Sequence, residues 1–127
     1  MTPSEYIANV LKTESVDWNA ISNRLSVVEI MRYLHAQHGL VTEVGELTDA
    51  LKKHIFYGQD LDRTNIIEEM GDVCWFLALL ADNLKISFED VWERNIAKLK
   101  ARYGDKFSQE KAEHRDLDKE REVLEGG

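Results

Sequence analysis

The sequence predicts an all-α protein, an antiparallel helical bundle completed by oligomerisation. Three observations lead to this fold class. The 127 residues include one proline and seven glycines, which is too little turn punctuation for many short strands. Apolar residues recur at helical spacing over several long segments. Only a few residues connect most of these segments, and short connections favour antiparallel neighbours.

The first two helices follow from capping residues and periodicity. Thr2-Pro3-Ser4-Glu5 has the form of a capping box with proline at the first helical position, so a helix is predicted from about Pro3 to Thr13. We expect Asp17 to Asn19 to form a loop. One long helix, kinked at Gly39, is then predicted from about Ser22 to Tyr57 on an apolar stripe and a Gly58 stop. The stripe consists of Leu40, Val44, Leu47, Leu51 and Ile55.

The next two helices are defined in the same way. A helix starting near Asp62 or Thr64 and ending around Asn83 carries a second stripe. Ser87 caps a further helix that Gly104 ends. The second stripe consists of Ile66, Met70, Val73, Leu77, Leu80 and Leu84, and the stripe of the last helix of Val91, Trp92, Ile96, Leu99 and Tyr103.

Charges dominate the C-terminal segment. From Asp105 onward apolar residues thin out and acids alternate with bases. This pattern is typical of an exposed helix or of an arm that clasps a partner. We therefore divide the chain into a domain at 1–104 and a charged helical tail at 105–127.

Composition limits the possible functions. With 43% hydrophobic and 31% charged residues, the chain is too apolar for disorder and long enough for one buried core. The net charge of -8 argues against nucleic acid and anionic membranes as partners, because phosphate backbones select basic surfaces. A phosphorylated substrate would need a cation or a local basic patch.

The expected compartment is the cytoplasm. Cys74 is the single cysteine, which excludes an intramolecular disulfide and a cysteine-based zinc cluster and fits a reducing environment. Met1 to Asn9 lacks the features of a signal peptide. The longest apolar run, Val73 to Ala81, is about half the length that a bilayer requires. We expect a soluble protein.

Two segments repeat one pattern of acid, apolar residue, glycine, acid and apolar residue. They are Glu43-Val44-Gly45-Glu46-Leu47 and Glu69-Met70-Gly71-Asp72-Val73. Acids at i and i+3 share one helical face, so each segment presents a pair of carboxylates at the edge of the core. Glycine inside a helix costs roughly 1 kcal/mol relative to alanine, which suggests that something approaches each backbone closely.

The four carboxylates converge if the two helices pack antiparallel along their stripes. Four neighbouring negative charges in a partly dry site require a cation, and all-oxygen ligation selects Mg²⁺ or Mn²⁺ over zinc. Di-iron bundles use Glu-x-x-His, which this chain lacks. Spacing alone is weak evidence, because Glu110 and Glu113, for example, share it, and most such pairs lie on solvated faces.

Candidate residues for phosphate and base binding are less distinctive. Asn95, Lys98 and Arg102 share one polar helix face, where lysine and arginine could hold phosphate oxygens, although cations near a helix C-terminus are common. Lys53 lies on the stripe of Glu46. The candidates for a base pocket are His35, Phe76 and the loop residue Trp18; a lone histidine is more often structural, and Phe76 more often belongs to a core.

These residues resemble the all-α nucleoside triphosphate pyrophosphohydrolases, also called MazG-like. The resemblance covers about Leu34 to Tyr103. The family motif is Glu-Glu-x-x-Glu, a variable gap and Glu-x-x-Asp. Thr42 stands where many members carry the first glutamate of the doublet. The four metal-binding and catalytic acids of the motif match Glu43, Glu46, Glu69 and Asp72.

The resemblance implies a specific activity. It implies Mg²⁺-dependent hydrolysis between the α- and β-phosphates of a nucleoside triphosphate, giving a nucleoside or deoxynucleoside monophosphate and pyrophosphate, with Mn²⁺ as a substitute. Such an enzyme would clear non-standard or surplus nucleotides. The resemblance also implies that protomers pair so that helices of two chains complete each site. The apolar residues Trp75, Phe76, Leu79 and Leu80 cover more of their helix than one antiparallel partner would bury, so we expect a homodimer or homotetramer. The alternatives are a phosphoribosyl-ATP pyrophosphohydrolase and a non-catalytic, metal-binding interaction module.

Overall fold

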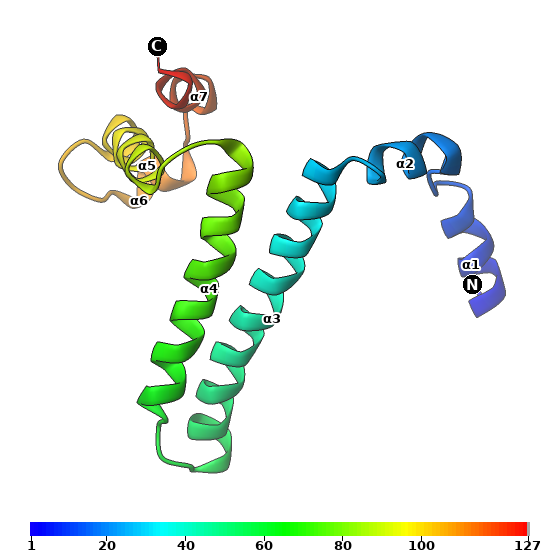
Figure 1. Ribbon diagram of the computed structural model, residues 1–127, viewed down its shortest axis with the longest axis horizontal. Coiled ribbons are helices and arrows are strands. Elements are labelled where there is room, and N and C mark those ends of the chain that lie inside the picture. Colours follow the sequence, from blue (N-terminus) through cyan, green and yellow to red (C-terminus); the bar gives the residue numbers. More distant parts are fainter. Residues whose placement is uncertain (127) are drawn as a thin grey trace.

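The computed structural model describes residues 1–126, and these form seven helices and no strand (Figure 1). The all-α class predicted from the sequence is confirmed. Most helices begin at a side-chain cap, including the capping boxes of Thr2 with Glu5 and of Ser87 with Asp90. The helices are α1 (Pro3–Leu11), α2 (Trp18–Leu25), α3 (Val28–Tyr57), α4 (Arg63–Leu84), α5 (Phe88–Tyr103), α6 (Gln109–Glu113) and α7 (Leu117–Glu125).

The predicted helix from Ser22 to Tyr57 is wrong at its start. The Asp17 side chain accepts a hydrogen bond from the backbone N–H of Ala20, so α2 already begins at Trp18, inside the predicted loop. Helix α2 ends at its C-cap Ser26, and Val27 is extended before α3 begins. Apolar periodicity runs through this junction, so it did not reveal the break.

Helices α3 and α4 form an antiparallel hairpin that runs through the middle of the molecule (Figure 1). The helices approach closely at small residues, and Ala36 is fully buried. A Cβ atom on Gly39 would lie 2.1 Å from the Phe76 ring, so any larger residue would require the ring to move. Helix α3 is continuous through Gly39, and the glycine makes room for a side chain of α4. The expected kink at Gly39 stays a prediction.

The C-terminal segment folds back onto the preceding helix. Helix α7 packs on α5, and Glu120 is only 4% exposed between them. The predicted exposed arm is therefore wrong for this face of α7, because the ion pairs of Glu120 fix it to α5. Gly127, the last residue of the predicted tail, lies outside the described residues.

A single chain leaves much apolar surface uncovered. The buried apolar side chains of residues 1–126 are three alanines, whereas large residues such as Trp75, Trp92 and Met70 are more than half exposed. The accessible surface is 10348 Å². A compact monomer of this mass would expose about 6,900 Å². No helix in the described part of the chain has the length and apolar character that a bilayer crossing requires.

Candidate metal centre

Three carboxylates meet between α3 and α4. Glu43 comes from α3 and Glu69 and Asp72 from α4, and each offers an oxygen within 4.8 Å of the others. Glu69 is 3% exposed, Glu43 is half-buried and Asp72 is exposed. The hairpin therefore brings together three of the four predicted ligands.

The electrostatics at Glu43 disfavour its negative charge. Burial raises the pKa of Glu43 above its ordinary value, and the adjacent Glu69 carboxyl and the charges of Glu46 and Asp72 add to this effect. The Thr42 hydroxyl, 3.2 Å from Glu43 Oε1, acts in the opposite direction. A bound cation would remove this repulsion.

Neutral groups provide the hydrogen bonds of the cluster. Asn65 Nδ2 donates to Glu69 Oε1 at 2.7 Å, and the Thr42 hydroxyl also lies 2.8 Å from the Gly39 carbonyl oxygen. Within residues 1–126, no lysine or arginine forms an ion pair with Glu43, Glu69 or Asp72. The negative charge of the cluster is therefore not neutralised by direct cationic partners.

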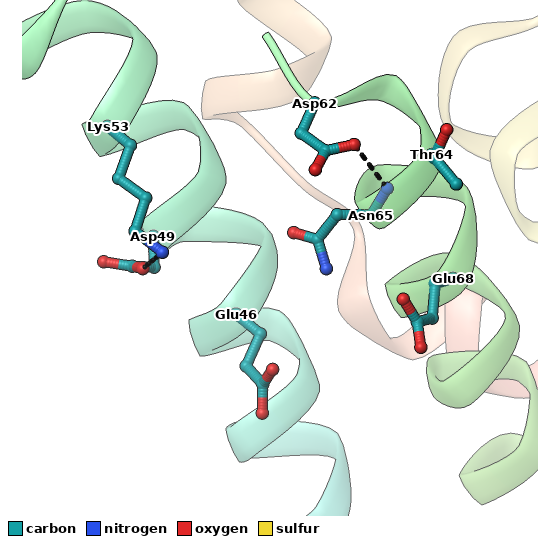
Figure 2. A pocket seen from close by; sticks show the side chains of 7 residues that line it. All are labelled: Glu46, Asp49, Lys53, Asp62, Thr64, Asn65 and Glu68. Carbon is teal, nitrogen blue, oxygen red and sulfur yellow. Dashed lines mark hydrogen bonds and ion pairs between the residues drawn. The ribbon is translucent and has the colours of Figure 1, made fainter. Parts of the chain in front are cut away.

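Glu46 lies one turn further along α3 and faces a neighbouring cavity. Figure 2 shows this polar cavity of about 380 Å³ between the end of α3 and the start of α4. Lys53 Nζ is 2.7 Å from Asp49 Oδ2, and Lys52 also pairs with Asp49, which lowers the Asp49 pKa to about 2. The predicted phosphate ligand Lys53 thus lines the same cavity as Glu46 but is paired with Asp49. The seven lining residues are Glu46, Asp49, Lys53, Asp62, Thr64, Asn65 and Glu68.

The donor set of the cluster fits a hard divalent cation. Glu43, Glu69 and Asp72 supply only carboxylate oxygens, which suit Mg²⁺ and Mn²⁺, while zinc sites usually include histidine or cysteine. Glu69 is buried with a single neutral donor as its hydrogen-bond partner in the described chain. A buried carboxylate of this kind is stabilised by a cation.

The predicted cationic stripe lies elsewhere in the chain. Asn95, Lys98 and Arg102 are on α5, which packs against α6 and α7. Asp72 precedes Leu84, the last residue of α4, by about 18 Å of helix at the usual rise. Figure 1 shows α5 beyond that end of α4. One chain does not bring this stripe to the carboxylates.

Arg102 already has an anionic partner. Its Nε and Nη2 atoms donate to the two carboxylate oxygens of Glu120 at 2.7 and 2.5 Å, and Arg115 also binds Glu120. The guanidinium lies 5.4 Å from the centre of the Tyr103 ring. Lys98 is half-buried and Asn95 is exposed. In this conformation Arg102 holds α7 on α5.

The base-pocket candidates separate into two places. His35 of α3 makes edge-on ring contacts with Phe76 and Trp75 of α4, with centroids 5.8 and 6.1 Å apart. Phe76 also fills the space beside Gly39, which gives it a packing role. Trp18 is 58% exposed on α2 and not in a loop.

The close approach predicted at the two motif glycines is not made within the described chain. A Cβ atom built on Gly45 or on Gly71 would have no neighbour within 4 Å. The exposed faces around them carry Val44 and Met70, each more than half exposed. Both motif glycines therefore face open space in the described chain.

A family comparison agrees with the geometry. The family model of the MazG nucleotide pyrophosphohydrolase domain matches residues 32–107, which include both carboxylate pairs and all of α4 and α5. The chain belongs to the MazG family. This membership places it among the nucleotide pyrophosphohydrolases, a family of metal-dependent hydrolases.

A phage protein is similar to part of this MazG chain. The Gene 37 protein of Mycobacterium phage L5 is 37% identical over 71 residues, which cover 50% of this chain and 60% of the phage protein. The match thus spans less than two thirds of that relative. No solved structure matches the chain.

Sequence reasoning missed one polar neighbour of the MazG acids. Asn65 lies four residues before Glu69 on the same face of α4, and its amide contacts the Glu69 carboxylate. The i to i+4 spacing of two polar residues was the signal that could have identified it.

Proposed function

We propose that the protein is a Mg²⁺-dependent pyrophosphohydrolase that cleaves nucleoside triphosphates between the α- and β-phosphates. The observation that carries this proposal is the cluster of Glu43, Glu69 and Asp72 without a cationic partner, in a chain of the MazG family. Mn²⁺ is expected to replace Mg²⁺. The products are a nucleoside or deoxynucleoside monophosphate and pyrophosphate.

The residues have separate tasks in this proposal. Glu43, Glu69 and Asp72 hold the metal, and Glu46 joins them from the next turn of α3. When bound, Mg²⁺ supplies positive charge that offsets the negative charge of the triphosphate and polarises its phosphoryl oxygens. One carboxylate of the cluster accepts the proton that the attacking water loses.

We also propose that the active form is a homodimer or homotetramer. The chain exposes 10348 Å², roughly 3,400 Å² more than a compact monomer of its mass. Obligate interfaces bury areas of about 2,000 to 5,000 Å². The exposed apolar side chains of α3, α4 and α5 supply the surface for such an interface.

Assembly would also bring a cationic stripe to the carboxylates. Within one chain, α5 packs against α6 and α7 instead of against the cluster. We propose that Asn95 and Lys98 reach the triphosphate of a neighbouring protomer, with Arg102 joining them if it leaves Glu120. Residues 1–104 then carry the chemistry, and the tail at 105–127 orients α5.

A substrate panel tests the activity. Purified protein is incubated with Mg²⁺ or Mn²⁺ and with each NTP, each dNTP and phosphoribosyl-ATP, while pyrophosphate and orthophosphate are measured separately. Pyrophosphate released in a metal-dependent manner from a nucleoside triphosphate supports the proposal. Turnover of phosphoribosyl-ATP alone supports the first alternative, and metal binding without any product supports the non-catalytic module.

Sedimentation tests the assembly. At micromolar concentration we expect at least twice the chain mass of 14.7 kDa. Activity per chain should fall on dilution, because a shared site disappears when the assembly dissociates. A compact and active monomer would contradict the proposed assembly.

A further inference from the structure

Asn65 donates a hydrogen bond to Glu69, the most buried acid of the cluster. Its Nδ2 atom lies 2.7 Å from Glu69 Oε1, and Glu69 is 3% exposed. Within residues 1–126, this amide is the nitrogen donor to the Glu69 side chain, and the Glu43 carboxyl lies beside the same side chain. The orientation of the Glu69 carboxylate therefore depends on Asn65.

Asn65 is itself held in place by the start of α4. Its backbone N–H donates to the Oδ1 atom of Asp62, the N-cap residue, at 3.0 Å (Figure 2). In Figure 2 the Asn65 side chain points from α4 toward the space between α4 and α3. The cap fixes the backbone of Asn65, and the helix places its side chain one turn before Glu69.

The chemistry of an amide suits this position. An amide N–H binds one carboxylate oxygen without adding charge and leaves the second oxygen for a cation. A lysine or arginine would neutralise the carboxylate and compete with a metal ion. Residues that orient metal ligands in this way typically change metal affinity by about 10- to 100-fold when removed.

We propose that Asn65 is a positioning residue that orients the Glu69 carboxylate for metal binding. This inference rests on the proposed function, because it requires the cluster of Glu43, Glu69 and Asp72 to hold a divalent cation. Asn65 thus joins the acids of the motif as an uncharged hydrogen-bond donor.

Direct Mn²⁺ binding without nucleotide tests the proposal. Electron paramagnetic resonance measures free Mn²⁺ in titrations of the full chain and of four variants, and circular dichroism measures their helix content. Asn65→Leu keeps a similar size but removes the donor, whereas Asn65→Gln keeps an amide that can still reach Glu69. Thr64→Ala changes a neighbouring residue of the same cavity and serves as the matched control. Glu69→Gln reports on the site itself.

The expected results distinguish the two proposals. Asn65→Leu should bind Mn²⁺ about 10- to 100-fold more weakly. Asn65→Gln should recover most of the affinity, Thr64→Ala should bind like wild type, and Glu69→Gln should lose binding. Wild-type affinity in Asn65→Leu together with loss in Glu69→Gln would overturn the role of Asn65 alone. Equal losses in the Leu and Gln variants would also overturn it, by assigning Asn65 to folding. Unchanged binding in Glu69→Gln would overturn the metal site and this inference with it.

Discussion

Two buried glutamates, one in each half of the molecule, differ in how their negative charge is compensated. Glu69, in the α3–α4 hairpin, is 3% exposed and receives one hydrogen bond from a neutral amide beside two further carboxylates. Glu120, between α5 and α7, is 4% exposed and is bound by Arg102 and Arg115. The arginines lower the pKa of Glu120 to about 2.

The difference separates a binding site from a structural ion pair. Buried charge is destabilising unless a partner compensates it, and the chain supplies that partner for Glu120. Around Glu69 it supplies no cationic partner, and burial together with the neighbouring carboxylates raises the pKa of Glu43. A cluster that a chain leaves uncompensated is suited to an external cation, whereas a compensated carboxylate fixes one helix to another.

The largest expected effect comes from removing a ligand of the uncompensated cluster. Asp72→Asn keeps the shape but removes a charge, so we expect pyrophosphate release to fall by at least about 100-fold. Without metal, the variant should be at least as stable as wild type, because the charge of Asp72 raises the Glu43 pKa. Turnover assays and thermal denaturation in EDTA measure both effects.

A substitution of an acid outside the cluster provides the control for this prediction. Glu110→Gln alters an exposed acid with the same i to i+3 spacing to Glu113 and should leave activity unchanged. Full activity in Asp72→Asn would assign the carboxylates to an ordinary solvated face.

The next effect tests the packing that brings α3 and α4 together. Gly39→Ala places a methyl group against the Phe76 ring, so unfolding free energy should fall by about 1 to 3 kcal/mol. Urea denaturation measures this loss. In a Phe76→Leu background the loss should be smaller, since the clash is with the ring. An equal loss in both backgrounds would show that Phe76 does not determine the need for glycine.

A smaller effect tests the compensated glutamate. Folding lowers the Glu120 pKa from 4.5 to about 2, so its charge stabilises the fold fully above about pH 4.5. This contribution is lost as the pH falls toward 2. Glu120→Gln should lower the melting temperature near neutral pH, and its difference from wild type should disappear at the acid end. A difference that stays constant from pH 7 to pH 2 would rule out this ionisation as the cause.

The smallest effect concerns the uncovered glycines. Gly45→Ala meets no neighbour within 4 Å, so helix propensity alone should raise stability by about 1 kcal/mol. Gly71→Ala provides the matched position on α4. Denaturation and sedimentation of each variant should be measured together. Lower stability with a dissociated assembly would instead show that a second chain approaches the hairpin at Gly45.

Local signals in the sequence determined the secondary structure and the motif. Periodicity and the Asp62 and Ser87 caps place α4 and α5 within a residue or two, because both signals depend on near neighbours in the chain. The i to i+3 spacing puts Glu69 and Asp72 on one face of α4, and the structure brings Glu43 to them. The break before Val28 was missed because apolar periodicity continues across it.

Tertiary structure alone decided which distant residues meet. Arg102 and Glu120 are 18 residues apart in sequence, and no local pattern marks that α7 folds back to bind this arginine. Gly39 and Gly45 are both glycines in the interior of α3. Of these two, only Gly39 faces a side chain of α4. Such contacts depend on how helix axes cross and how the chain returns on itself. Spacing along one helix cannot encode them, because each contact belongs to two elements at once.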